Sequence, residues 1–266
     1  MRHSEYSAGS GLLWITFSTN SAVICDMEPV QLNGPLLCID TSIPVGSVAL
    51  AGQDSPEDWP THTGSISRAE NLFPVIRELL DEYGLEPAGL GGVAVASGPG
   101  SFTGLRIAAS TAKTLAWTLG KPLFAAGSLL CQANRAATSG LPVCAAFDAG
   151  RGEFYAACFR WRDTADAPEE LLNPGAWDLD SLCRRLVSLC TGGKVIMLGQ
   201  GYLNRRAELD EKLSELLEAA DDCLHEPDAR SLGQLVLAAP ERYLVDRIGT
   251  FEPDYIRVGQ VGLRLG

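Results

Sequence analysis

The chain has 266 residues, of which 46% are hydrophobic and 20% charged, so it can build one large domain or two lobes around a sizeable core. The formal net charge is −12, from 33 Asp and Glu against 21 Lys and Arg, and it opposes sequence-independent attraction to a phosphate backbone. None of the eight cysteines forms a C-x-x-C pair, which favours a reducing cytoplasm, and no stretch reaches the roughly 18 apolar residues of a membrane helix.

The first predicted element along the chain is a β-hairpin. Residues 1–35 show neither helical nor strand periodicity, so we expect an N-terminal extension there, with a start-site extension and a flexible arm as the two alternatives. The apolar run 36–40, a turn with Pro44 and Gly46, and a second apolar run over 47–51 then predict two antiparallel strands.

A polar loop over residues 53–67 and an amphipathic helix are expected next. Apolar residues recur at helical spacing from 68 to 83, and the pattern ends before Gly84. The apolar stripe of this helix must face the core or a partner.

A glycine-rich run, SGPGSFTGLR, joins a predicted strand over 91–96 to a predicted helix of small residues over 104–119. Its glycines permit positive φ and close backbone approach, while Ser101 and Thr103 can cap the free N–H groups of the helix. Such a turn favours anions, but similar turns occur in α/β proteins that bind nothing there.

The second half of the chain repeats the plan of the first. After a strand over 123–126 and a helix to about 137, a strand over 142–147 leads to Asp148, a glycine turn and a returning strand over 154–160. Strand, aspartate, glycine turn and strand therefore occur twice, although two unrelated hairpins would look alike.

We expect an α/β protein with two lobes, each with a sheet and helices, of the actin, hexokinase and Hsp70 class (the ASKHA folds). Its parts would be the extension 1–35, an N-terminal lobe over 36–140, and a C-terminal lobe and tail over 141–266. The last of these is expected to hold the following elements: a loop over 162–175, helices over 179–190, 203–219 and 231–239, and a strand over 194–198.

Several motifs resemble those of the TsaB (YeaZ) family, which takes part in the synthesis of threonylcarbamoyladenosine in bacterial tRNA. Besides the glycine-rich run, the matching strings are LLCIDTS and GSVAL in the first hairpin, AENLFP at 69–74, AFDAGRGEFY at 146–155 and EPDYIR at 252–257. The resemblance is dense over 36–159 and sparse afterwards. One departure is Ser67-Arg68-Ala69-Glu70, where the family commonly has His-Ser-Glu, and it puts any role of that histidine in doubt.

The resemblance implies a subunit without catalysis of its own, which scaffolds and activates a TsaD-type catalytic subunit by dimerising with it. It further implies a TsaE-type ATPase as a partner, a homodimer when the chain is alone, and contact with tRNA only through the complex. No cofactor would be required, although ATP or ADP could occupy a shared interface.

Histidine usage argues against a metal site. The catalytic relative carries a histidine pair just after the strand equivalent to 123–126, but residues 126–131 here contain none. His3, His62 and His225 lie far apart in the sequence, so no H-E-x-x-H type of metal site is expected.

Two sets of site residues follow from the resemblance and from the positions of these residues. The nucleotide set is Asp40, Thr41, Ser42, Gly98, Gly100, Ser101 and Asp148, with Asx turns as the alternative role of the two aspartates. The partner-interface set is Glu70, Asn71, Phe73, Ile76, Leu80, Arg106, Ala109, Ala112, Lys113 and Ala116, with packing on the helices' own sheet as the alternative. Two other functions stay open: a free-standing nucleotide phosphohydrolase or small-molecule kinase of the same fold class, and a purely structural homodimer.

Overall fold

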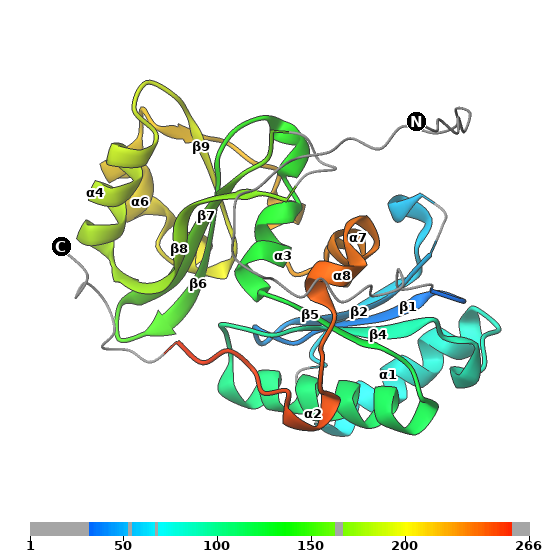
Figure 1. Cartoon of the computed structure of the whole chain (residues 1–266). Helices are drawn as coiled ribbons and strands as arrows, with labels where there is room; N and C mark the ends of the chain where they lie inside the picture. Colours follow the sequence, from blue (N-terminus) through cyan, green and yellow to red (C-terminus); the bar gives the residue numbers. More distant parts are fainter. Residues whose placement is uncertain (1–31, 53–54, 67–68, 163–166, 257–266) are drawn as a thin grey trace, which may run out of the picture.

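Two five-stranded sheets form the framework of the computed structural model (Figure 1). The structure describes residues 32–52, 55–66, 69–162 and 167–256. The predicted extension therefore lies almost wholly outside the described residues.

The first sheet has the strand order β3-β2-β1-β4-β5. Its strands are β1 (Leu36–Asp40), β2 (Gly46–Ala51), β3 (Thr61–Gly64), β4 (Gly92–Ala96) and β5 (Leu123–Ala126). β1 pairs antiparallel with β2 and parallel with β4, so the predicted hairpin is present. The prediction of a loop over 53–67 was wrong for residues 61–64, which form the edge strand β3. This strand was missed because its sequence, THTG, has no alternation of apolar and polar residues.

The second sheet repeats this topology in the order β10-β9-β6-β7-β8. Its strands are β6 (Val143–Gly150), β7 (Glu153–Arg160), β8 (Glu169–Asp178), β9 (Val195–Leu198) and β10 (Leu217–Glu218). β6 pairs antiparallel with β7 and parallel with β9, as β1 does with β2 and β4. In both sheets the first strand thus lies at the centre and the third and fifth at the edges, which confirms the duplicated two-lobe fold.

Helices cover both faces of the first sheet. Figure 1 shows α1 (Ala69–Glu82) and α2 (Phe102–Leu119) on one face, with α7 (Ala229–Ala238) and α8 (Pro240–Tyr243) on the other. Burial on both faces explains why β1, β2 and β4 are buried at every residue and read as continuous apolar runs.

The second sheet carries the remaining helices, and short 3-10 turns complete the chain. These helices are α3 (Ser128–Asn134), α4 (Leu179–Leu189), α5 (Gln200–Asn204) and α6 (Arg206–Leu213). The 3-10 turns are η1 (Pro56–Asp58), η2 (Pro87–Gly89), η3 (Ala137–Ser139), η4 (Asp222–His225) and η5 (Ile248–Thr250). Two predictions here were wrong: the loop over 162–175 contains the start of β8, and the single helix over 203–219 is instead α5, α6 and β10, because the backbone leaves helical geometry at Arg205.

The C-terminal part of the chain returns to the N-terminal lobe. α7 packs on β1 and β2, and α8 contacts β5. α3 lies between the lobes, where it contacts β6, β7 and α7. The boundary at 140/141 therefore separates the two sheets, while residues 229–251 belong by their packing to the first lobe. No helix of the described residues is long and apolar enough to cross a bilayer.

Candidate functional site

The glycine-rich run connects β4 to α2 and packs directly on the turn after β1. Ser101 N donates to Ser42 O at 2.6 Å, and Thr41 Oγ1 donates to Gly104 O at 2.8 Å. A Cβ at Gly100 would lie 2.2 Å from Ser42 O, and one at Gly104 would lie 2.1 Å from Thr41 O. These glycines therefore let two backbone segments approach closely.

The C-terminal segment holds the run from its other side. Ser97 Oγ donates to Asp254 Oδ2 at 2.8 Å, and Asp254 N donates to Ser97 O at 2.7 Å. Gly98 has φ +120, and a Cβ there would lie 2.4 Å from Asp254 O. The part of the EPDYIR string that the structure describes, residues 252–256, thus lies against the glycine-rich run through Asp254, so two motifs distant in the sequence meet in the fold.

The backbone donors expected to receive a phosphate are partly engaged inside the chain. Gly98 N donates to Ser128 Oγ at 2.9 Å, Ser101 N is bonded to Ser42, and Gly104 N donates to the capping Ser101 Oγ at 3.3 Å. Nucleotide binding by this loop stays a prediction, and it would require at least some of these bonds to open.

The two aspartates brace their own turns. Asp40 is buried, and its Oδ1 accepts from Ser42 N at 3.0 Å and Ser42 Oγ at 2.6 Å. Burial raises the pKa of Asp40 although the hydrogen bonds from Ser42 oppose the rise. The exposed Asp148 accepts from Gly150 N at 2.7 Å and from Asn204 Nδ2 at 3.2 Å. Both therefore make the local bonds of the Asx-turn alternative.

The predicted interface residues of α1 and α2 are divided between the core and the surface of the N-terminal lobe. Half of the predicted interface residues are buried in the N-terminal lobe, with at most 6% of each exposed: Ile76, Leu80, Ala109, Ala112 and Ala116. Such burial is what the alternative, packing on the helices' own sheet, predicts for these five residues, and their role in a partner interface stays a prediction. The rest are exposed or half-buried: Glu70, Asn71, Phe73, Arg106 and Lys113.

Large aromatic side chains mark the outer surface of the two helices: Phe73 was among the predicted interface residues, whereas Phe102 and Trp117 were not. Phe102 is 55% exposed and Trp117 is 74% exposed on α2, and Phe73 is 50% exposed on α1. Arg106 lies 4.3 Å from the Phe102 ring centroid and its Nε donates to Tyr255 Oη at 3.3 Å. The signal was present in the sequence as two large aromatic residues in a helix otherwise rich in small ones.

Metal ligands are not gathered in the described part of the chain. No group of three or more His, Cys, Asp or Glu lies close enough there to hold an ion. His62 bonds Glu82 at 2.9 Å, and His225 is buried and stacked on Tyr202 with a centroid distance of 5.4 Å.

Two lobes with one strand order, each opening on an antiparallel hairpin with an aspartate near its turn, define a two-lobed α/β protein of the ASKHA class.

A family model described as "TsaD: tRNA N6-adenosine threonylcarbamoyltransferase" matches residues 64–259. The chain is 31% identical over 201 residues to the tRNA threonylcarbamoyladenosine biosynthesis protein TsaB of Escherichia coli, which covers 71% of this chain and 84% of that protein. The same-named protein of Bacillus subtilis is 35% identical over 130 residues, a match that spans 48% of this chain and 56% of that protein. The solved structure of YeaZ from Pseudomonas aeruginosa is 28% identical, with a TM-score of 0.62 over 84% of this chain and 100% of that one.

The chain therefore belongs to the TsaB (YeaZ) family, within the wider family that the TsaD model describes.

Proposed function

We propose that this chain takes part in the synthesis of N6-threonylcarbamoyladenosine at position 37 of tRNA, as a non-catalytic subunit that scaffolds and activates a TsaD-type catalytic subunit. Membership of the TsaB family supports the reaction, because the relatives carry that name. The observation that carries the scaffolding role is the exposed aromatic surface of α1 and α2, which we call the aromatic face and define by Phe73, Phe102 and Trp117.

Exposed aromatic rings are typical of interaction surfaces. Moving a large apolar side chain from water into an interface is favourable, so contiguous exposed apolar surface often marks a binding site. Aromatic residues are also enriched at the centres of protein interfaces. Arg106, beside Phe102, adds a cation that remains accessible. Figure 1 shows α1 and α2, which carry the aromatic face, on the opposite face of the first sheet from α7 and α8. A partner bound to these two helices would leave the contacts of α3 with β6, β7 and α7 in place.

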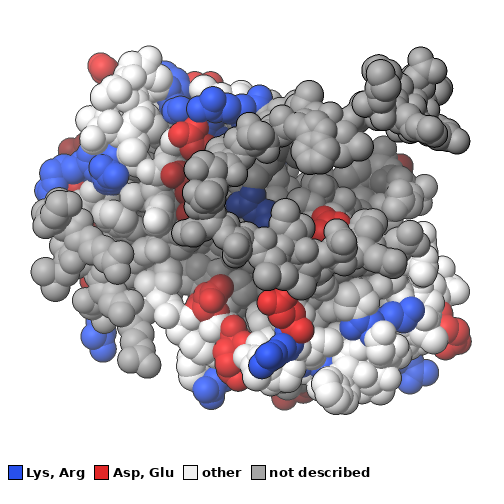
Figure 2. Space-filling view, in the orientation of Figure 1, with Lys and Arg blue, Asp and Glu red and all other residues white. Residues whose placement is uncertain are grey.

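The electrostatics of the surface support contact with tRNA through the complex only. The chain carries a formal net charge of −12, and Figure 2 shows acidic and basic side chains interspersed over the visible face. On the same proposal the chain forms a homodimer through the aromatic face when alone, and a TsaE-type ATPase with bound ATP or ADP is a further partner of the assembled complex.

The proposal is tested by capture of the TsaD-type subunit of the same organism on the tagged full-length chain. We expect the double variant Phe73→Glu, Phe102→Glu to reduce capture at least tenfold while its thermal melting stays like that of the unmodified chain. The matched control is Val187→Glu, Leu203→Glu, which changes two residues of the C-terminal lobe that are 53% and 41% exposed. Equal capture by the two double variants would refute the aromatic face as the interface.

The catalytic claim is tested separately. The chain alone is expected to form no threonylcarbamoyladenosine on tRNA and to hydrolyse no ATP. Steady ATP hydrolysis by the purified chain, lost in Asp40→Asn, would favour the free-standing phosphohydrolase instead.

A further inference from the structure

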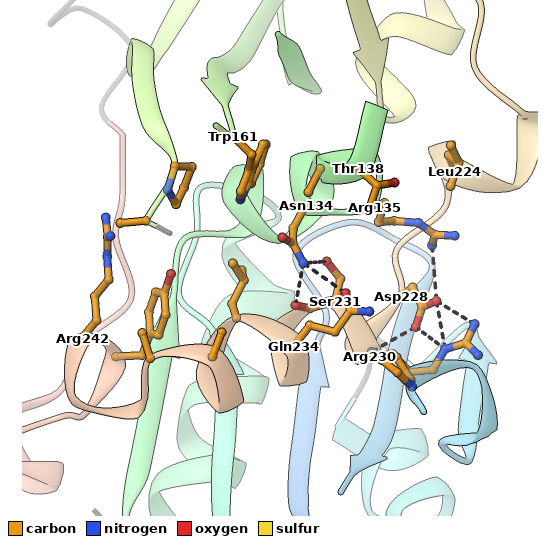
Figure 3. A pocket seen from close by; sticks show the side chains of 18 of the residues that line it. Asn134, Arg135, Thr138, Trp161, Leu224, Asp228, Arg230, Ser231, Gln234 and Arg242 are labelled. Atoms are coloured by element: carbon orange, nitrogen blue, oxygen red, sulfur yellow. Dashed lines mark hydrogen bonds and ion pairs between the residues drawn. The ribbon is translucent and has the colours of Figure 1, made fainter. Parts of the chain in front are cut away.

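A cavity of about 460 Å³ lies between the two lobes, and none of the site residues above contributes to it. We call it the interlobe pocket. Its walls come from α3, α7, α8 and η1, and from Trp161 and Leu224 of the C-terminal lobe (Figure 3). The volume is within the range of small-molecule sites, which is ~300–1,000 Å³, and a position between two lobes is common for them.

The charged side chains that line the interlobe pocket carry one more positive than negative charge: Arg135, Arg230, Arg242, Asp228 and Glu57. Arg230 donates hydrogen bonds to both carboxylate oxygens of Asp228. Its Nε lies 3.0 Å from Oδ1 and 3.1 Å from Oδ2, and its Nη2 lies 2.8 Å from Oδ2. Arg135, whose side chain is 13% exposed, reaches the same carboxylate only at 3.8 Å. Two guanidinium groups thus share the Asp228 carboxylate, and Glu57, whose negative charge also acts on Arg230, is the second carboxylate of the lining.

The guanidinium group of Arg135 has few hydrogen-bond partners. Its one hydrogen bond within the described residues is from Nη1 to Glu226 O at 2.7 Å, although a guanidinium has five N–H donors. Burial lowers the pKa of Arg135 even with Asp228 nearby, which is the sign of a cation whose lost hydration is not fully replaced. An anion entering the pocket would supply the missing acceptors.

The middle of the interlobe pocket offers a free amide donor. Asn134 Nδ2 donates to Ser231 O, to Ser231 Oγ and to Gln234 Oε1 at 3.1–3.3 Å, which fixes the orientation of the Gln234 amide. Gln234 Nε2 has no acceptor among the described residues, and Figure 3 shows Gln234 between Asn134 and the Arg135–Asp228 pair. The other wall is apolar and includes Leu235 and Tyr243.

We propose that the interlobe pocket binds a small organic anion, whose phosphate or carboxylate group lies between Arg135 and Gln234 Nε2 and whose flat apolar body lies against Leu235 and Tyr243. Charge-assisted bonds from a guanidinium fit both kinds of anion. Because both lobes line the pocket, the bound molecule would also restrain one lobe relative to the other. This inference does not depend on the proposed function.

The test is calorimetric titration of the full-length chain with 1-naphthyl phosphate, 1-naphthoate and the neutral 1-naphthylmethanol. We expect one saturable site for at least one of the two anions, with an affinity at least tenfold above that of the neutral probe. Binding of the phosphate alone identifies phosphate monoesters as the ligand class, binding of the carboxylate alone identifies carboxylates, and binding of both supports the shared anion chemistry.

The decisive variant is Gln234→Glu, which keeps the oxygen that accepts from Asn134 and replaces the free donor by negative charge. We expect it to weaken anion binding at least tenfold without lowering the melting temperature, and Arg135→Gln to weaken it similarly. Arg185→Gln, on the exposed face of α4, is the matched charge control and should bind like the unmodified chain. No saturable binding of either anion, or equal binding by Gln234→Glu and Arg185→Gln, would overturn the proposal.

Discussion

Replacing Gly104 by alanine separates two roles of the glycine-rich run: close packing on the first hairpin, and a cradle for phosphate. The added Cβ would lie 2.1 Å from Thr41 O, so α2 or the turn after β1 must move by more than 1 Å to reach an ordinary contact. That movement would also strain the bond of 2.8 Å from Thr41 Oγ1 to Gly104 O.

The cost follows from these contacts. Overpacking of a tight site costs about 1–3 kcal/mol, and loss of the hydrogen bond adds about 1 kcal/mol. Alanine regains about 1 kcal/mol because it is a better helix former than glycine. We therefore expect the free energy of unfolding to fall by about 2 kcal/mol, which lowers the melting temperature by about 4–8 °C in a chain of this size.

The assay is thermal unfolding followed by circular dichroism, with Gly193→Ala as the control. No atom lies within 4 Å of a Cβ built at Gly193, so we expect a change below about 0.5 kcal/mol there. A melting temperature of Gly104→Ala within about 1 °C of the unmodified chain would refute the packing argument. Loss of nucleotide binding without loss of stability would favour the cradle.

Three further predictions concern buried groups. Ala112→Arg places a cation in the core of the N-terminal lobe and should destabilise the fold by more than about 4 kcal/mol, seen as loss of soluble, folded protein; a folded variant that merely fails to bind its partner would contradict this. Burial raises the pKa of Asp40, so its ionised form destabilises the fold as pH rises above about 3.9, and Asp40→Asn should be the more stable protein in urea at pH 7 but not near pH 4. If the stability advantage of Asp40→Asn over the unmodified chain became smaller with rising pH, the predicted direction would be wrong. Burial lowers the pKa of His225, so the protein should lose stability as pH falls below about 6.5, and His225→Gln should lose less between pH 8 and pH 5. Equal losses in both proteins would show that His225 is not responsible.

The elements that could be predicted from sequence are those whose signal is local. β1, β4 and β6 are short apolar runs that end at turn residues, and α1 has apolar residues at helical spacing, so their positions follow from the chain itself. β3 and β8 were missed because an edge strand is defined by the strand beside it, and that neighbour is not visible in a polar segment.

The candidate site divides in the same way. Residue types and spacing predicted the glycine-rich run as the junction between a strand and a helix. Its three glycines, however, are required by Thr41, Ser42 and Asp254, which approach from distant parts of the chain. Three small residues of α2 were predicted as part of a partner interface, and the structure shows them buried: Ala109, Ala112 and Ala116. Among the exposed aromatic residues on the outer side of the helices, Phe73 was predicted as an interface residue, whereas Phe102 and Trp117 were recognised only once the direction of each face was known.

The sequence by itself determined the class of fold, the internal duplication and the family, because strand and helix periodicity, repeated turns and motif strings are properties of order along the chain. The tertiary structure alone decided which face of α2 is buried, which carbonyl oxygens touch the glycines, and that α3, η1, α7 and α8 enclose a pocket with Arg135 at one end. Burial, hydrogen-bond partners and local charge depend on residues brought together from separate segments, and only the packing of those segments sets the distances between them.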